Sequence, residues 1–346
     1  MKRIPLGMSG IEVSEFCLGT MTWGSQTDEA GAHEQIALAL DHGVTFWDAA
    51  EMYPTNPVRA ETVGDTERII GTWFARAGGR DRVQLATKIT GEGQEAVRGG
   101  APITPAQMRL SVEDSLRRMQ TDWIDLYQLH WPNRGSYHFR QSWGYRPPSD
   151  RVAVLDHIDA MLATAADLVA EGKVRAFGLS NETVWGAGQW LARAAAGQGP
   201  RMASVQNEYS LLCRQFDTDW AEMSAMEDMP LLAFSPLAAG LLSGKYQGDV
   251  TPPGTRRAVN ANLGGRITPR VFPAVDAYEA VARKHDLDLC QMAIAFCRTR
   301  PYPCIPIVGA TTTAQLRVAL GAAGLTLGRG VLADIAAAHR AHPWPF

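Results

Sequence analysis

Short apolar runs alternate with amphipathic segments along most of the chain. Runs rich in β-branched or apolar side chains predict strands near residues 15–19, 44–48, 83–88, 124–130, 174–179, 203–207, 230–235 and 304–308. Helical periodicity follows each of them, over 32–43, 62–77, 104–120, 152–172, 184–196, 216–227, 273–299 (with a break near Asp286) and 312–322. Strands that alternate with helices pair in parallel, so this repetition predicts one closed (β/α)8 TIM barrel and a single domain over residues 1–346.

Local signals support some of these boundaries. Thr104 before Pro105 is typical of a helix start, with a hydroxyl N-cap followed by proline at the first helical position. Gly172 can take the left-handed conformation that ends a helix. The segment 3–13 predicts a β-hairpin that closes the bottom of the barrel.

Two connections are too long to be simple links. Residues 131–150 follow the fourth strand of the predicted barrel, and residues 236–273 follow the seventh. Both leave strand ends, so both should emerge at the C-terminal face, where barrel enzymes hold their chemistry. The first is rich in aromatic residues and the second in Gly, Pro and Arg, which favours a functional role over disorder.

Four polar residues stand at or just after consecutive predicted strand ends: Asp48, Tyr53, Lys88 and His130. The spacing is about one βα unit from Asp48 to Lys88 and another from Lys88 to His130. A lysine near an aspartate stays protonated, and its charge is expected to favour the phenolate of Tyr53 and so to lower the tyrosine pKa. His130 could orient a carbonyl group. Together they predict a proton donor beside a bound hydride carrier.

Each residue also has a structural interpretation. Asp48 alone would be a cap or turn former, Tyr53 a half-buried aromatic, Lys88 a solvated strand end and His130 a hydrogen-bonded core histidine. The combination at successive strand ends is more specific than its members.

The bulk properties limit the alternatives. A net charge of −3 gives no electrostatic reason to expect nucleic acid or anionic lipid as a partner. The sequence shows no long apolar run and no secretory core, so no membrane partner is expected. Five cysteines without metal spacing predict reduced thiols, a cytoplasmic location and no metal site.

Motifs through nearly the whole chain resemble those of the aldo-keto reductase superfamily, in particular its bacterial Tas-like and potassium-channel β-subunit-like members. They are Leu18–Gly24, Asp48–Tyr53, Lys88, Leu126–Pro132, Gly178–Glu182, Gln206–Leu212, Ser235–Ala238, Gly240–Tyr246 and Gly309–Thr312. The block from Ser235 to Tyr246 is the most specific. No Gly-x-Gly-x-x-Gly motif is present, which agrees with a barrel that binds a dinucleotide in an extended form.

The resemblance implies roles for individual residues. Tyr53 would be the general acid, assisted by Lys88 and Asp48, with His130 orienting the substrate. Ser180, Asn181 and Gln206 would hold the nicotinamide carboxamide, and Phe234 would stack on its ring. The remaining implied cofactor contacts are Gly19, Thr20, Met21, Gln26, Ser235, Pro236, Leu237, Ala238, Gly240, Leu242, Lys245, Arg256, Gly309, Thr311 and Gln315.

The same resemblance predicts the cofactor to be NADPH, with NADH possible. Arg256 follows the pair Pro252-Pro253, where relatives place an arginine against the 2′-phosphate. Many relatives have Arg, Lys or Ser where Thr311 stands. Val318 and Ala319 stand where many relatives have Glu and Asn, and this difference removes polar contacts to the adenine.

The substrate is expected to be a small aldehyde or ketone in a pocket formed by Trp23, Tyr53, His130, Trp131 and Tyr209. Trp143 and Trp344 fit ordinary packing better than this pocket. One alternative function is a regulatory subunit that binds NADPH with little turnover. Another is a Schiff-base enzyme that uses Lys88, which the neighbouring Asp48 disfavours. The physiological substrate, the direction of the reaction and the oligomeric state stay open.

Overall fold

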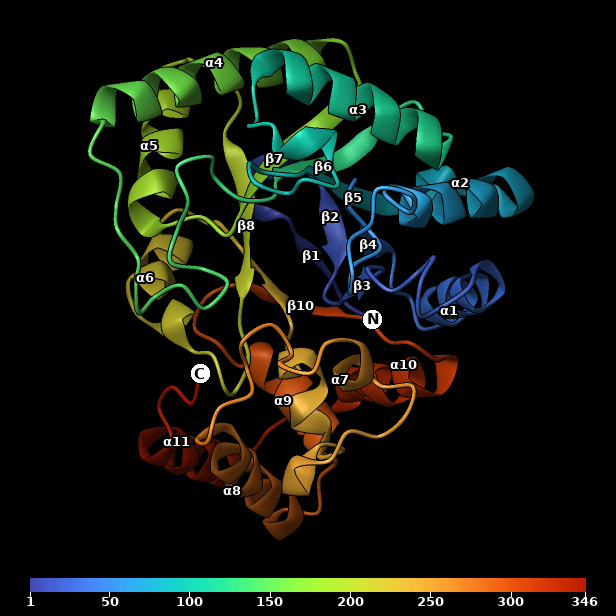
Figure 1. Ribbon diagram of the computed structural model, residues 1–346, viewed down its shortest axis with the longest axis vertical. Helices are drawn as coiled ribbons and strands as arrows, with labels where there is room; N and C mark the ends of the chain where they lie inside the picture. The colour runs from blue at the N-terminus through green and yellow to red at the C-terminus, as the bar shows by residue number, and fades with distance from the viewer.

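Eight parallel strands close into a barrel in the computed structural model, which describes residues 1–346 (Figure 1). Around the barrel the order is β10-β3-β4-β5-β6-β7-β8-β9. The strands are β3 (Cys17–Gly19), β4 (Phe46–Asp48), β5 (Gln84–Ile89), β6 (Ile124–Leu129), β7 (Val174–Ser180), β8 (Met202–Glu208), β9 (Leu231–Phe234) and β10 (Cys304–Val308). The predicted (β/α)8 barrel is therefore confirmed, and every predicted strand is present.

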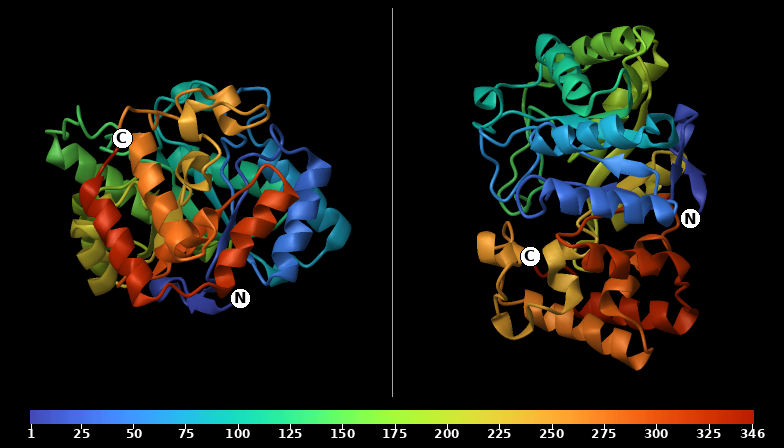
Figure 2. Two further views of the ribbon diagram at one scale, coloured as in Figure 1. Left: turned by 90° about the horizontal axis from the view of Figure 1, so that it is seen from below. Right: turned by 90° about the vertical axis from the view of Figure 1, so that its right-hand side faces the viewer.

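Helices surround the barrel and connect its strands (Figure 2). They are α1 (Glu29–Asp41), α2 (Asp65–Ala77), α3 (Pro105–Met119), α4 (Arg151–Ala170), α5 (Val184–Ala195), α6 (Asp219–Met226), α7 (Arg256–Val259), α8 (Val271–Lys284), α9 (Leu289–Cys297), α10 (Thr313–Leu320) and α11 (Arg329–Ala341). One large hydrophobic cluster joins their inner faces to the outer faces of the strands. No single helix combines the length and the apolar character of a membrane span; one bent pair, Thr313–Gly324 with Arg329–Ala341, meets both only when taken together.

Helix ends follow the capping chemistry that the sequence indicates. The Thr104 side chain accepts a hydrogen bond from the Gln107 backbone N–H, as predicted for the start of α3. Gly172 has φ of 74° just after α4. The break near Asp286 is real, because Asp288 caps a new helix by accepting from the Gln291 N–H. Helix α11 was not predicted from the sequence; it follows the last βα unit and packs against α8 through Val331, Ile335 and Ala338.

The N-terminal hairpin closes one end of the barrel, as predicted. Strands β1 (Arg3–Pro5) and β2 (Glu12–Ser14) pair antiparallel, and Leu6 and Val13 pack against inward-facing side chains of the barrel. Gly7 has φ of 52°, and a Cβ there would lie 2.6 Å from two backbone oxygens, so the hairpin approaches the barrel too closely for a larger residue. The open end is consequently the opposite one, where the strands finish.

Candidate active site

Parallel register brings the four predicted catalytic residues together at the open end of the barrel. Asp48 ends β4, Lys88 lies near the end of β5, and His130 follows β6 directly. Tyr53 comes from the loop after β4. The Lys88 ammonium donates to Asp48 Oδ2 at 2.7 Å, to the Ala49 carbonyl at 2.7 Å and to the Tyr53 hydroxyl at 3.2 Å. The Tyr53 and His130 rings meet edge-on, with centroids 5.9 Å apart.

A buried polar network holds the other side of Asp48. Gln128 Nε2 donates to Asp48 Oδ1 at 3.1 Å, and Gln206 Nε2 donates to the same oxygen at 2.8 Å. The carboxylate is thus fixed from β5, β6 and β8 at once, which preorganises the site. Gln128 was not among the predicted site residues. The signal for it is an amide two residues before His130, at the position of β6 that pairs with Lys88.

Burial sets the electrostatics of these residues. Burial raises the pKa of Tyr53, and the charge of Lys88 lowers it by less, so the net pKa is above the usual range for tyrosine. Lys88 does lower the pKa of Tyr53, as expected, but desolvation outweighs the cation, so the net pKa is raised and not lowered. Burial opposes the charge of Lys88, but Asp48 more than compensates and raises the lysine pKa. Burial and then Lys88 hold the pKa of His130 well below its normal value. At neutral pH the site holds a neutral phenol, an ammonium and a neutral imidazole.

A cavity of about 800 Å³ opens above this group, within the range typical of small-molecule and cofactor sites. Most of the residues expected to contact cofactor or substrate line it: Gly19, Thr20, Met21, Gln26, Asp48, Tyr53, His130, Trp131, Asn181, Gln206, Phe234, Ser235, Pro236, Leu237, Gly240, Lys245, Arg256, Gly309, Thr311 and Gln315. Lys88 lies beneath the floor of the cavity and is fully buried.

Five expected residues do not line the cavity. Trp23 is fully buried in the outer core, where its Nε1 donates to Gln35 Oε1 at 3.0 Å. Tyr209 is also fully buried, and its hydroxyl donates to Asp217 Oδ1 at 2.9 Å. The assignment of these two residues to the substrate pocket is wrong, because packing behind the strand ends turns both rings away from the opening.

The other three are Ser180, Ala238 and Leu242. The Ser180 hydroxyl donates to the Gln206 carbonyl at 2.9 Å, and the Ala238 and Leu242 side chains are fully buried. Trp143 and Trp344 stack on each other, with centroids 4.9 Å apart, and neither lines this cavity.

One buried amide oxygen at the edge of the cavity has no hydrogen-bond partner. Asn181 Nδ2 donates to the His130 carbonyl at 2.9 Å, whereas its Oδ1 is buried without a hydrogen-bond partner. A buried acceptor without a partner is costly unless a ligand donor completes it. A carboxamide N–H₂ has the required chemistry, and Phe234, at the end of β9, offers a flat face to a ring in the same cavity. These residues fit a nicotinamide.

The loop after β9 turns tightly and brings Lys245 to the cavity. Ser235, Ala238, Ala239 and Gly240 all have positive φ, at 54°, 48°, 59° and 95°. The N–H groups of Ala238 and Gly240 donate to the carbonyls of Ser235 and Leu237, at 2.8 and 2.9 Å, so the turn is closed by its own backbone. A Cβ on Gly240 would lie 3.0 Å from Cε of Lys245, so glycine lets the lysine approach. The Lys245 ammonium can therefore supply this loop's positive charge to an anion in the cavity.

Of two consecutive arginines on α7, only Arg256 faces the cavity. Arg257 is buried and pairs with Asp249 and the Val250 carbonyl. Arg256 makes no ion pair, and its Nε is buried without a partner. Burial, and then Arg266, lower the pKa of Arg256 to about 10, while Tyr246 and Tyr53 oppose them. The guanidinium of Arg256 therefore has no carboxylate partner within the chain.

The fold and this site define a family. The sequence profile of the Aldo/keto reductase family matches residues 15–340, and the chain belongs to that family. It is 40% identical to Protein tas of Escherichia coli over 99% of this chain and 98% of that one. Identity is 32% to the uncharacterized oxidoreductase YrpG of Bacillus subtilis, over 96% and 94% of the two chains. It is 27% to a probable voltage-gated potassium channel subunit beta of Arabidopsis thaliana, over 90% and 88%. Both the expected family and its expected branches are confirmed, and together they support an oxidoreductase role.

Proposed function

We propose that this protein reduces aldehydes or ketones to alcohols with NADPH and that Tyr53 is the proton donor. The observation that carries the proposal is the Tyr53 hydroxyl on the cavity floor, 3.2 Å from Lys88 Nζ. When bound, the cofactor would supply a hydride to the carbonyl carbon. Asn181 and Phe234 would hold its nicotinamide, and Lys245 and Arg256 would hold its phosphates.

The residues of the chain then handle the proton. Tyr53 is neutral at pH 7 because its pKa lies above the ordinary tyrosine value of about 10, so its proton is available for donation. As negative charge develops on the carbonyl oxygen, the phenol gives up its proton, and Lys88 stabilises the phenolate that remains. His130 has a buried Nδ1 without a partner. Its neutral ring lies beside Tyr53, where it can orient the carbonyl oxygen.

Substitution of Tyr53 by Phe tests the role of the phenol. The variant should reduce 4-nitrobenzaldehyde at least about 100-fold more slowly than the wild type, because such donors typically contribute ~10²–10⁴-fold. The dissociation constant for NADPH should change less than about 3-fold. The assay is NADPH oxidation, followed by absorbance, with NADPH binding measured separately by fluorescence. A variant that keeps more than about a tenth of the wild-type turnover would show that Tyr53 is not the donor.

Arg256→Ala tests the cofactor preference. Charge-assisted hydrogen bonds to a phosphate contribute about 1.5–3 kcal/mol, so NADPH should bind roughly 10–100-fold more weakly to the variant. NADH binding should change little. Arg146→Ala, an exposed arginine in the loop after β6, is the matched control for loss of one charge. Equal losses for both cofactors would remove Arg256 from 2′-phosphate recognition.

The regulatory alternative predicts a different pattern. A redox-sensing subunit would bind NADPH tightly and turn over none of several aldehydes. Turnover of any of them that depends on Tyr53 would favour the enzyme.

A further inference from the structure

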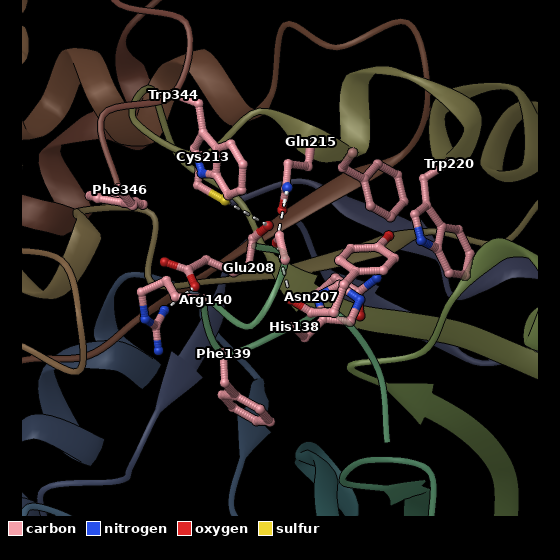
Figure 3. Close-up of a pocket in the computed structure, with 13 residues that line it drawn as sticks. His138, Phe139, Arg140, Asn207, Glu208, Cys213, Gln215, Trp220, Trp344 and Phe346 are labelled. Carbon is pink, nitrogen blue, oxygen red and sulfur yellow. Dashed lines mark hydrogen bonds and ion pairs between the residues drawn. The ribbon is translucent and has the colours of Figure 1, made fainter. Parts of the chain in front are cut away.

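A buried charge cluster forms part of the cavity wall beside the catalytic residues. Arg140, in the loop after β6, donates from Nη1 to Glu208 Oε2 at 2.6 Å. Arg266, in the loop after β9, donates from Nε to Glu208 Oε1 at 2.9 Å and approaches the same oxygen with Nη2 at 2.7 Å. Figure 3 shows Arg140 and Glu208 side by side, with Phe139 next to them. Both arginines line the main cavity.

The cluster carries more positive than negative charge. Two guanidinium groups share one carboxylate, which leaves a net charge of +1. The side chains of Arg140, Arg266 and Glu208 are only 15%, 5% and 6% exposed. Burial opposes the charge of Glu208, but the two arginines lower its pKa overall. The carboxylate is therefore ionised and contributes one full negative charge.

The neighbouring titratable groups do not neutralise the excess. The thiol of Cys213 is buried and its pKa is raised by burial, so it stays protonated. Burial lowers the pKa of His138 to about 4, so its ring is neutral at pH 7. The Nε of Arg140 is buried without a hydrogen-bond partner. Buried ion clusters of this kind seldom stabilise a fold relative to apolar packing. Stability therefore does not account for this cluster, whereas binding of an anionic ligand does.

Arg140 ties the cluster to the side of the cavity where the proton donor lies. A chain of ring contacts links it to the proton donor: Tyr53 to His130 at 5.9 Å, His130 to Trp131 at 5.0 Å, and Trp131 to Phe139 at 5.9 Å. Phe139 and Arg140 are consecutive, and both have positive φ, at 56° and 64°. Non-glycine residues in that region are strained, and such strain is concentrated at functional sites. Arg266 comes from the same loop after β9 as Lys245 and Arg256, and its charge helps to lower the pKa of Arg256, so the cluster borders the residues assigned above to the cofactor phosphates. Arg140 comes from the loop after β6, on the side of Trp131 and Phe139.

We propose that the carbonyl substrate carries a carboxylate group and that Arg140, supported by Arg266, binds it while the carbonyl oxygen faces Tyr53. The proposal rests on the proposed reductase function and names its substrate class. The guanidinium fork matches a carboxylate with paired hydrogen bonds, and the anion neutralises the excess charge of the cluster. Trp131 and Phe139 would pack against the apolar part that joins the two groups. In the reaction the carbonyl gains the hydride of NADPH at carbon and the proton of Tyr53 at oxygen. The carboxylate is unchanged, and Tyr53 recovers its proton from solvent.

A pair of nearly isosteric aldehydes tests this substrate class. In 4-carboxybenzaldehyde and 4-nitrobenzaldehyde the planar substituents have similar shape, but only the first is anionic at pH 7. The wild type should show a kcat/KM at least 10-fold higher for the carboxylate. The corresponding pair, 3-carboxybenzaldehyde and 3-nitrobenzaldehyde, tests a shorter distance between the carbonyl and the charged group. Arg140→Met should bring the ratio of the two kcat/KM values close to one. Arg140→Lys should keep part of the preference, and the exposed Arg146→Met should keep all of it.

Binding provides a readout that does not require turnover. In the Tyr53→Phe variant, which should not catalyse the reverse reaction, 4-carboxybenzyl alcohol should bind with NADP⁺ present at least 10-fold more tightly than 4-nitrobenzyl alcohol, as measured by calorimetry. Adding Arg140→Met should remove that difference while NADP⁺ affinity is kept. If nitrobenzaldehydes are reduced and the carboxylates have no advantage, the substrate class is wrong and the reductase function stands. If no aldehyde is reduced by any form, and neither alcohol binds preferentially, both proposals fail.

Discussion

The buried pair of Lys88 and Asp48 predicts a large, pH-dependent loss of stability for Lys88→Met. Lys88 is fully buried, Asp48 is 2% exposed, and the three ammonium hydrogens have three acceptors within 3.2 Å. Methionine has nearly the same length but leaves Asp48 Oδ2 and the Ala49 carbonyl without this donor. Removing one partner of a buried pair costs about 3–5 kcal/mol, and we expect that loss in the free energy of unfolding at pH 7.

One observation limits the size of that loss, and a second substitution tests its origin. Asp48 Oδ1 keeps its bonds from Gln128 and Gln206, so the carboxylate is not left wholly unsatisfied. Adding Asp48→Asn removes the remaining buried charge. The double variant should therefore regain at least ~1 kcal/mol relative to the sum of the two single losses, as coupled neighbours do. Urea denaturation of the four proteins in this cycle measures both quantities.

The pH dependence of the free energy of unfolding tests whether the charged Lys88 causes this loss. The folded state raises the pKa of Lys88 above its unfolded value of about 10.4, so the stabilising contribution is complete below that pH. It is lost as pH rises through the folded pKa. The stability difference between wild type and Lys88→Met should be constant from pH 7 to about pH 10 and shrink above it. A loss below about 1 kcal/mol at pH 7, or a difference that does not shrink in alkali, would refute this account of the pair.

Three further substitutions separate local structural roles from the site. Thr104→Ala removes the N-cap of α3 and should lower the free energy of unfolding by about 1 kcal/mol in chemical denaturation, with Thr104→Ser as a control that keeps the bond. Trp23→Phe removes the hydrogen bond to Gln35 and some packing, so it should destabilise the protein by about 1–3 kcal/mol. The ratio of kcat/KM among aldehydes should not change; a changed ratio would show that Trp23 contacts the substrate. Tyr209→Phe breaks the bond to Asp217, and thermal unfolding should show a lower Tm while KM for the aldehyde stays the same.

Much of the architecture follows from periodicity. Eight apolar runs separated by helical segments leave few ways to bury both faces of each strand, and the closed parallel barrel is the one observed. The polar residues at strand ends could be grouped in advance, because the carboxyl ends of parallel strands meet at one edge. Helix α11 was missed although Val331, Ile335 and Ala338 have helical spacing, because it lies outside the eight repeated βα units and packs on α8, a surface that exists only in the fold.

The barrel, its hairpin plug and the set Asp48, Tyr53, Lys88 and His130 could be recognised in the chain alone, because apolar periodicity and the residues at or just after strand ends are local features. The direction in which neighbouring aromatic side chains face depends on packing in the complete fold, which places Trp23 and Tyr209 in the outer core. The tertiary structure also decided that desolvation outweighs Lys88 in setting the pKa of Tyr53, since burial is a property of the whole fold. The two arginines on Glu208 come from loops 68 and 58 residues away, and no local pattern relates such positions until the barrel closes.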